Sequence, residues 1–514
     1  MKRLPALLHP FMFSLASLLF LYAKAMVTVS PAQIIRPLIV FWTILALLIW
    51  PVFQFVRDWY WTGILLSLFV ASMFFSSAFF AIIGIVLSGL LILGFALSHL
   101  LKRKAAVSHI TSTLNVVSIS AIVVLMFYLL PFFLEVPLEY YRPPLFQKKS
   151  LPAISSIVSS EVMPDIYYIV LDGYGRTDIL QEYYDFDNSD FTEYLLSKGF
   201  LLPDYTHSNY SRTALSIAST LNMESIQEIA PGLDDSLFWW LMAPLIDHSR
   251  VREMLEEAGY TTISISTNWN ITDNPSTDIY LHPYPVMLSD FEGHILGSTP
   301  LGMFRRSLSP FVSVPNMETH RRIIRYNFEA LEEIPNIPGP KFVFAHIISP
   351  HPPFVFDQFG NPLDTGYGFR FADGSDFPGT REQYRLNYIA QVKFVNAQLK
   401  PVVAEILEHS DTPPIIILQA DHGPGMFTDF DSPDQTCLRE RFSIFAAYYL
   451  PGVDPGAIPS DLTPVNLYRI IFNKYFGTDM PLLENAYYSH HDAMHIYHRD
   501  DVSSLVDSCA FATP

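Results

Sequence analysis

Five apolar stretches follow one another in the first 134 residues, and they constrain the fold more than any other feature. Each approaches the roughly 20 residues that a helix needs to cross the hydrocarbon core of a bilayer. They cover residues 7–27, 36–56, 60–79, 81–101 and 114–134. A signal peptide would explain the first stretch but not those that follow it. The sequence therefore predicts a five-helix transmembrane bundle over residues 1–134, with four spans as the alternative because 60–101 has almost no hydrophilic divider.

Basic residues predict the orientation of this bundle. Lys2 and Arg3 precede the first stretch, Arg57 follows the second, and the cluster Lys102–Lys104 follows the fourth. Basic residues flanking membrane helices concentrate on the cytoplasmic side. Five spans place all of these residues there and deliver the chain after Leu134 to the outer face. No stretch carries the buried acid–base pair that transporters use, so the bundle is predicted to be an anchor.

The rest of the chain has the composition of an acidic globular domain. Residues 1–150 hold 11 of the 32 Lys and Arg residues but only 3 of the 50 Asp and Glu residues. The remainder has no basic stripe, which excludes a nucleic-acid-binding surface. We divide the chain into the anchor 1–134, a juxtamembrane linker 135–164, a globular domain 165–485 and a His-rich tail 486–514.

The globular domain alternates buried-strand patterns with helical ones. Short β-branched or aromatic runs, each typical of a strand covered on both faces, occupy Asp165–Asp172, Thr261–Thr267, Lys341–Ser349, Pro414–Gly423 and Phe442–Leu450. Amphipathic helical stretches separate them. This alternation predicts an α/β fold with a mostly parallel sheet and helices on both faces.

Three of these strands end in side chains that bind metals or protons. The first ends on Asp172, the third carries His346 and leads to His351, and the fourth ends on Asp421 and His422. Ligands of open α/β sheets bind beyond the carboxyl ends of the strands, and carboxylate with imidazole suits zinc or manganese. Each pair alone is also compatible with an ordinary turn. Together they indicate a metal site at one sheet edge.

A run of small hydroxylic residues offers a nucleophile. The stretch Thr206–Met223 leads into a helical pattern, so a hydroxyl at its start would face the positive end of a helix. Thr213 is the first candidate, followed by Ser211 and Ser208. The alternative is a helix N-cap without a chemical role.

Four short motifs in one order resemble a known superfamily. They are VLDG at Val170–Gly173, NYSRTALS at Asn209–Ser216, SPHPPF at Ser349–Phe354 and QADHG at Gln419–Gly423. With the membrane anchor in front, the chain resembles membrane-anchored members of the sulfatase and alkaline-phosphatase superfamily. It looks most like lipoteichoic acid synthase and the phosphoethanolamine transferases. The resemblance implies a sulfatase-like domain outside the membrane.

The resemblance assigns a metal-binding role to four residues. Asp172 matches the early acidic ligand, Asp421 and His422 match the late pair, and Thr213 matches the nucleophile that also contacts the metal. It implies one divalent metal, Zn or Mn rather than Ca or Mg.

It also assigns the residues that contact the substrate. Thr213 and His351 match the catalytic positions, with His351 beside the transferred group or the leaving oxygen. His346 and Arg176 are nearby substrate-binding candidates without a secure counterpart.

The implied function is the transfer or hydrolysis of phosphoester headgroups of membrane lipids or cell-envelope glycans. The protein is expected in the cell (inner or plasma) membrane, multi-pass, with its catalytic domain on the extracytoplasmic side. Two alternatives remain open: a sulfuric-ester hydrolase and a catalytically silent envelope-polymer-binding protein. The sulfatase motif C/S-x-P-x-R has only a partial match from Ser208 to Arg212, with Tyr210 in place of Pro. The oligomeric state, the donor and the acceptor stay open.

Two C-terminal features have two interpretations each. Cys437 and Cys509 lie in a compartment where disulfides persist, and they either pair or stay free thiols. His491 and His495 are spaced to share a helix face and bind a metal, but a solvated His-rich tail is the simpler expectation.

Overall fold

The computed structural model describes residues 4–74, 104–134, 136, 163–234, 236–431, 433–490 and 495–509. These residues form two compact units. The membrane-helix unit comprises Met1–Glu135 and Val286–Val314, and the sheet unit comprises Val136–Pro285 and Pro315–Pro514. Val286–Val314 thus groups with the membrane helices, and the C-terminal segment groups with the sheet. The domain boundaries expected at 134, 164 and 485 stay predictions.

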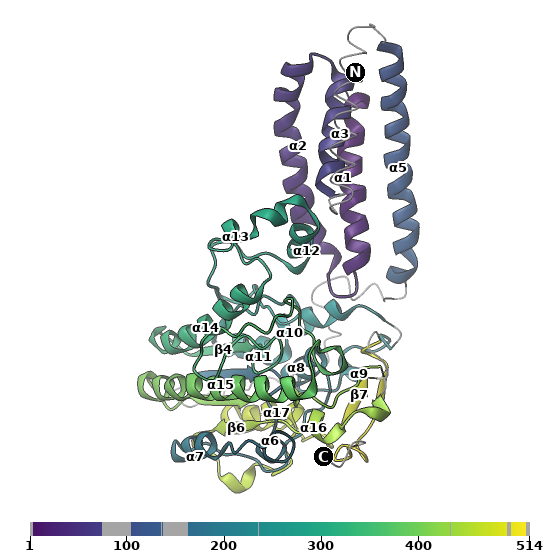
Figure 1. Ribbon diagram of the computed structural model, residues 1–514. Coiled ribbons are helices and arrows are strands. Elements are labelled where there is room, and N and C mark those ends of the chain that lie inside the picture. Colours follow the sequence, from purple (N-terminus) through teal and green to yellow (C-terminus); the bar gives the residue numbers. More distant parts are fainter. Residues whose placement is uncertain are drawn as a thin grey trace. The chain divides into compact units, whose positions relative to one another are not determined.

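The membrane-helix unit is built from long apolar helices (Figure 1). Its main helices are α1 (Leu4–Ala25), α2 (Ile35–Val56), α3 (Trp59–Phe74) and α5 (Lys104–Leu134). Three segments are long and apolar enough to cross a membrane, namely Ala6–Ala25, Pro31–Val56 and Val107–Leu134, and α3 is a shorter apolar helix. The expected span 81–101 lies outside the described residues, so the five-helix count stays a prediction.

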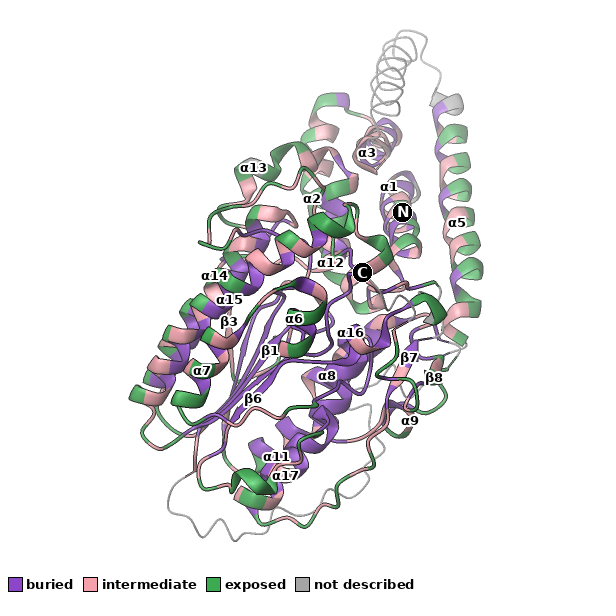
Figure 2. Cartoon of the chain, turned by 60° about the horizontal axis from the view of Figure 1, so that its bottom comes forward, coloured by how far each residue is buried: buried purple, intermediate pink, exposed green. Residues whose placement is uncertain are grey.

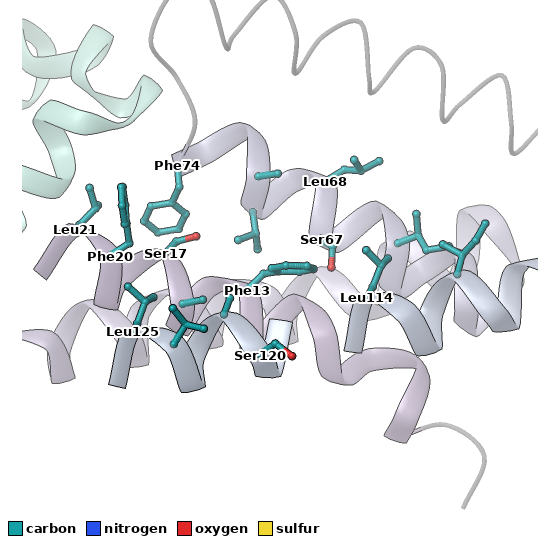
Figure 3. Close-up of a pocket in the computed structure, with 17 residues that line it drawn as sticks. Phe13, Ser17, Phe20, Leu21, Ser67, Leu68, Phe74, Leu114, Ser120 and Leu125 are labelled. Atoms are coloured by element: carbon teal, nitrogen blue, oxygen red, sulfur yellow. The ribbon is translucent and has the colours of Figure 1, made fainter. Parts of the chain in front are cut away.

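An apolar cavity of about 700 Å³ lies between α1, α3 and α5 (Figure 3). Its wall is hydrocarbon, with Phe13, Leu68 and Leu125 among its side chains and only the hydroxyls of three serines as polar groups. None of its lining residues is acidic or basic. This agrees with the anchor role expected for the bundle.

The sheet unit is organised around a six-stranded sheet in the order β3-β2-β4-β1-β5-β6. The strands are β1 (Ile166–Leu171), β2 (Thr261–Ile265), β3 (Ile279–Leu281), β4 (Lys341–Ile347), β5 (Ile415–Gln419) and β6 (Ala446–Tyr449). All neighbouring pairs are parallel except β5 and β6. The mostly parallel sheet is therefore confirmed.

Helices cover both faces of this sheet (Figure 2). One face packs against α6 (Thr177–Tyr184), α7 (Ser189–Ser197), α14 (Met317–Glu333) and α15 (Arg381–His409). On the other face, Tyr168 and Phe342 contact Tyr468 of α17 (Pro464–Phe476), and α8 (Thr213–Asn222) packs against α17. The remaining helices of the unit are α9 (Ile226–Ile229), α10 (Ala243–Asp247), α11 (Arg250–Glu257) and α16 (Leu438–Phe442).

The strand expected at Phe442–Leu450 is shorter than the sequence suggests. Its first part completes α16, whose Glu440 and Arg441 are fully buried. The apolar pattern of residues 442–450 carries no signal that Glu440 and Arg441, just before it, are buried. Only Ala446–Tyr449 pairs with β5, and it does so in the antiparallel direction.

The C-terminal segment is not a solvated tail in its described part. Tyr488–His490 (β7) pairs with Arg499–Asp501 (β8), and Cys437 is disulfide-bonded to Cys509. His490 is buried and its Nδ1 lies 2.9 Å from Ser211 Oγ. The expectation of a solvated tail failed because His490 and Tyr488 pack against the loop 206–212, which no local pattern shows. His491 lies outside the described residues.

Buried Glu440 makes the stability of the fold depend on pH. Burial raises the pKa of its carboxyl from 4.5 to about 8. As pH rises from about 5 to about 8, the unfolded chain loses this proton while the folded chain keeps it, so the free energy of unfolding falls. We expect Glu440→Gln to remove this fall, measured as the thermal unfolding midpoint of the detergent-solubilised full chain across that pH range.

Glu318→Gln is the matched control, because the Glu318 side chain is mostly exposed. It should keep the pH slope of the unsubstituted protein. Parallel midpoint curves for Glu440→Gln and the unsubstituted protein would contradict the assignment.

Candidate metal centre

Strand register brings two distant carboxylates together. β1 lies between β4 and β5, and Val170 pairs with His346 on one side and with Gln419 on the other. Val170 and Gln419 form a register pair on parallel strands. Asp172 and Asp421 each lie two residues further along, at the carboxyl edge of the sheet. Asp172 and Asp421 therefore meet at one edge of the sheet, as expected from the strand ends.

Three side chains at this edge form a donor cluster. Asp172, His346 and Asp421 each offer one ligand atom, and these atoms lie within 4.8 Å of one another. All three residues are buried, and Asp172 Oδ1, Asp421 Oδ2 and His346 Nε2 have no hydrogen-bond partner. Burying carboxylate oxygens without donors is costly. A divalent cation would compensate them, and two oxygens with one imidazole nitrogen fit zinc or manganese.

Hydrogen bonds at the rim orient two of these ligands. The Gly173 amide donates to Asp421 Oδ1 at 3.0 Å, which leaves Oδ2 for the cluster. Gly173 has φ +72°, a conformation that side-chain-bearing residues rarely adopt. His346 Nδ1 lies 2.9 Å from Thr272 Oγ1, which directs Nε2 toward Asp172 Oδ2 at 3.4 Å.

The unprotonated ring nitrogen of His422 faces the same cluster. Its Nδ1 must donate to the Gly423 carbonyl at 2.8 Å, so Nε2 carries a lone pair. That Nε2 lies 3.3 Å from Asp421 Oδ2 and 3.6 Å from Asp172 Oδ1. Burial lowers the pKa of His422 to about 3, which keeps the ring neutral. A neutral imidazole is the form that binds a metal.

Thr213 is the hydroxyl that contacts this group. It is the first residue of α8, and its Oγ1 lies 3.1 Å from His422 Nε2. Ser211 Oγ instead contacts His490, and Ser208 Oγ donates to the Tyr210 carbonyl. Of the three hydroxyls expected from the sequence, the structure thus brings Thr213 to the cluster.

His351 lies on the loop after β4 and is fixed to Asp172 through the backbone. Its amide donates to the Asp172 carbonyl at 3.0 Å, and its Nδ1 bonds to the Pro352 carbonyl. Its Nε2 lies 3.7 Å from Asp373 Oδ2. Burial alone would lower the pKa of His351, but the carboxylates of Asp172 and Asp373 raise it above its ordinary value.

Sequence reasoning missed Asp373 and Arg441, which hold the surrounding loops together. Arg441 is buried, and its Nη1 donates to Asp373 Oδ2 at 2.8 Å while its Nε donates to the Ser211 carbonyl at 2.9 Å. Although burial would raise the pKa of Asp373, His351 and Arg441 hold it below its usual range. Neither residue carries a local signal, because charged residues in loops and short helices are ordinarily solvated.

Arg176 is engaged elsewhere. Its guanidinium pairs with Asp178 at 2.6 Å and donates to the Thr206 carbonyl at 3.2 Å. Its described contacts do not include the donor cluster, and its substrate role stays a prediction.

Arg212, immediately before Thr213, is a second residue that sequence reasoning left without a role. Its guanidinium lies 3.8 Å from the Phe430 ring centroid, and its buried Nε has no hydrogen-bond partner. Burial, with Arg441 nearby, lowers its pKa to about 9, so the side chain stays cationic at neutral pH. The carboxylates of Asp373, Asp376 and Asp431 oppose part of this lowering, and a cation beside Thr213 attracts an anion.

Comparisons with known proteins add to this geometry. The sequence model of the family described as Sulfatase matches residues 164–495. The structure is similar to the periplasmic domain of EptC from Escherichia coli, with 10% identity, 63% of this chain and 89% of that chain covered, and a TM-score of 0.41. It is similar to the lipooligosaccharide phosphoethanolamine transferase EptA from Neisseria meningitidis, with 12% identity, 76% of this chain and 68% of that chain covered, and a TM-score of 0.39. It is also similar to BT1596, a 2-O GAG sulfatase, with 14% identity, 62% of this chain and 72% of that chain covered, and a TM-score of 0.37. No curated protein matches the chain.

Removing one carboxylate of the cluster should remove the metal. We expect Asp421→Asn to lower the zinc or manganese content of the purified full chain at least about tenfold, because a metal ligand is lost. Elemental analysis by mass spectrometry measures this content after growth with each metal.

Asp273→Asn is the matched control. Asp273 is an acid outside the cluster that accepts hydrogen bonds from Tyr280 and the Thr267 amide. This variant should keep the metal, and equal metal content in both variants would contradict the centre.

Proposed function

The chain belongs to the sulfatase family, and from this premise we propose that it is a membrane-anchored, metal-dependent enzyme that transfers or hydrolyses phosphoester headgroups of lipids or cell-envelope glycans through Thr213. The observation that carries the proposal is the contact of Thr213 Oγ1 with His422, beside two buried carboxylates that each keep one oxygen without a donor among the described residues.

The metal would be held by Asp172, Asp421, His422 and Thr213, as the sequence motifs imply. The position of His346 Nε2 supports a ligand role for this residue as well, in place of substrate contact. A bound divalent cation lowers the pKa of a nearby hydroxyl and neutralises charge on a phosphate oxygen.

Thr213 is then the nucleophile. Its proton passes to solvent, and its Oγ1 forms a bond to phosphorus while the bond to the leaving oxygen breaks. The position at the start of α8 supports this role, because the helix N-terminus favours the negative charge that develops there.

His351 supplies the proton for the leaving oxygen. Its raised pKa supports a protonated ring near neutral pH. In the second half of the reaction, water or an acceptor hydroxyl attacks phosphorus, its proton goes to His351, and Thr213 Oγ1 is released.

Arg212 would hold the transferred anion. Its buried Nε, which has no hydrogen-bond partner among the described residues, supports contact with a non-bridging oxygen of the phosphoryl group. Asp373 and Arg441 act on this step only by positioning the loops that carry His351 and Ser211.

Contacts inside the membrane-helix unit support the expected topology in its described part. Phe41, near the start of α2, contacts Phe74 at the end of α3, and Tyr22, near the end of α1, stacks on Phe133 at the end of α5. The ends of α1, α3 and α5 thus lie on one side of this unit, as five spans predict. The expected span 81–101 lies outside the described residues, so the five-span count and the outward orientation rest on the sequence.

A covalent adduct on Thr213 is the decisive prediction. We expect the full chain, quenched during turnover of a 4-nitrophenyl phosphodiester, to carry one phosphoryl-containing group on Thr213 by peptide mass spectrometry. Thr213→Ala should lower turnover at least about a thousandfold because the nucleophile is lost.

Ser211→Ala is the matched control and should stay within about tenfold, since its hydroxyl contacts His490 and not the cluster. The same assay with 4-nitrophenyl sulfate tests the alternative. Turnover of the sulfate ester without any adduct on Thr213 would contradict the proposal and favour a sulfuric-ester hydrolase.

A further inference from the structure

An insertion from the middle of the catalytic sequence belongs to the membrane-helix unit. It covers Val286–Val314 and contains α12 (Asp290–Ser298), a 3-10 turn (Pro300–Phe304) and α13 (Arg305–Leu308). The chain passes between the two units at residues 135–136, 285–286 and 314–315. The insertion therefore gives the catalytic sequence two more connections to the anchor than the linker alone provides.

Specific contacts fasten the insertion to α1 and α2. Arg36 forms an ion pair with Glu292 and donates to the Met287 carbonyl at 3.0 Å. Phe291 is fully buried, with its ring edge-on to Tyr22 at 6.1 Å, and its amide donates to the Gln33 side chain. A paired charge and a buried aromatic ring make this a built contact rather than a chance approach.

These contacts lie at one end of the bundle. Tyr22 is near the end of α1, and Arg36 is the second residue of α2. Figure 1 shows α12 and α13 beside this end of α2. In the predicted orientation this is the extracytoplasmic end, where the bilayer changes from acyl chains to headgroups.

The insertion exposes large apolar side chains at this level. Met303 is 79% exposed, Phe304 54% and Phe311 63%, and Arg305 is exposed beside them. We call Met303, Phe304 and Phe311 the insertion tip. On α2, Ile35 and Ile39 are exposed as well, as expected of a helix that faces lipid.

We propose that the insertion 286–314 is a membrane-docking element whose tip enters the outer leaflet, with Arg305 facing lipid phosphates. Aromatic and long apolar side chains with a neighbouring arginine are the composition that binds at the headgroup boundary. Lipid is the occupant because the tip follows α12 in the chain, and α12 packs against α1 and the turn before α2, two helices that must themselves be surrounded by lipid. The inference does not rest on the proposed reaction, since it needs only that α1 and α2 span the bilayer in the predicted orientation.

The test measures how deeply the tip lies in lipid. Both native cysteines are paired in the disulfide, so a nitroxide attached to Phe304→Cys labels one place on the full chain. The protein is reconstituted in vesicles of phosphatidylethanolamine and phosphatidylglycerol, and power-saturation paramagnetic resonance compares accessibility to oxygen and to a water-soluble nickel chelate. We expect oxygen to reach the label more readily than the chelate, because oxygen concentrates in acyl chains.

Phe359→Cys is the matched control, since Phe359 is 79% exposed in the sheet unit. Its label should favour the nickel chelate, and Phe311→Cys, a second position in the tip, should behave like Phe304→Cys. A chelate-accessible label at both tip positions would overturn the proposal. A label shielded from both reagents would also overturn it, because it would indicate a second protein chain in place of lipid.

Discussion

Two carboxylates share a buried sheet edge, each with one oxygen that has no hydrogen-bond donor among the described residues, and the rest of the structure depends on this constraint. The parallel register of β1 and β5 fixes Asp172 beside Asp421, and both side chains are buried. Burying such carboxylate oxygens is costly unless positive charge is supplied. The chain supplies imidazoles there, and His422 is kept neutral by its own burial. The missing positive charge is what a divalent cation provides.

Two arginine side chains, Arg441 and Arg212, lie near the donor cluster but contribute no ligand atom to it. Arg441 links the loop before α8 to Asp373, and Asp373 faces His351. The buried Nε of Arg212 has no hydrogen-bond partner in the described part of the chain. Arg441 thus holds loops together through its hydrogen bonds, whereas the Nε of Arg212 makes no such bond. The backbone of Gly423 lies close to α16, because a Cβ at this position would be 2.0 Å from the Glu440 carbonyl oxygen. The segment after β5 therefore packs directly against the helix that carries Arg441.

Much of this arrangement could be predicted from the sequence because it is encoded locally. Apolar runs that end on Asp172 and Asp421, with a third that carries His346, predict both the strands and their shared edge, and Thr213 leads into a helical pattern. Asp373, Arg441 and the burial of His490 could not be predicted, because each depends on loops that meet only after folding. The insertion 286–314 gave no signal either: its contacts with Gln33 and Arg36 join residues more than 250 positions apart. Local patterns thus predict the donors but not the residues that position them.

The central claim is that one cation joins the distant acids and imidazoles, and locating that cation tests it most directly. Crystals or single particles of the full chain loaded with zinc would show where the metal lies, with anomalous scattering at the zinc edge to identify it. The account predicts one strong peak about 2.0–2.2 Å from carboxylate oxygens of Asp172 and Asp421 and from an imidazole nitrogen of the cluster. A cluster without a peak, or a peak found only elsewhere on the chain, would contradict it.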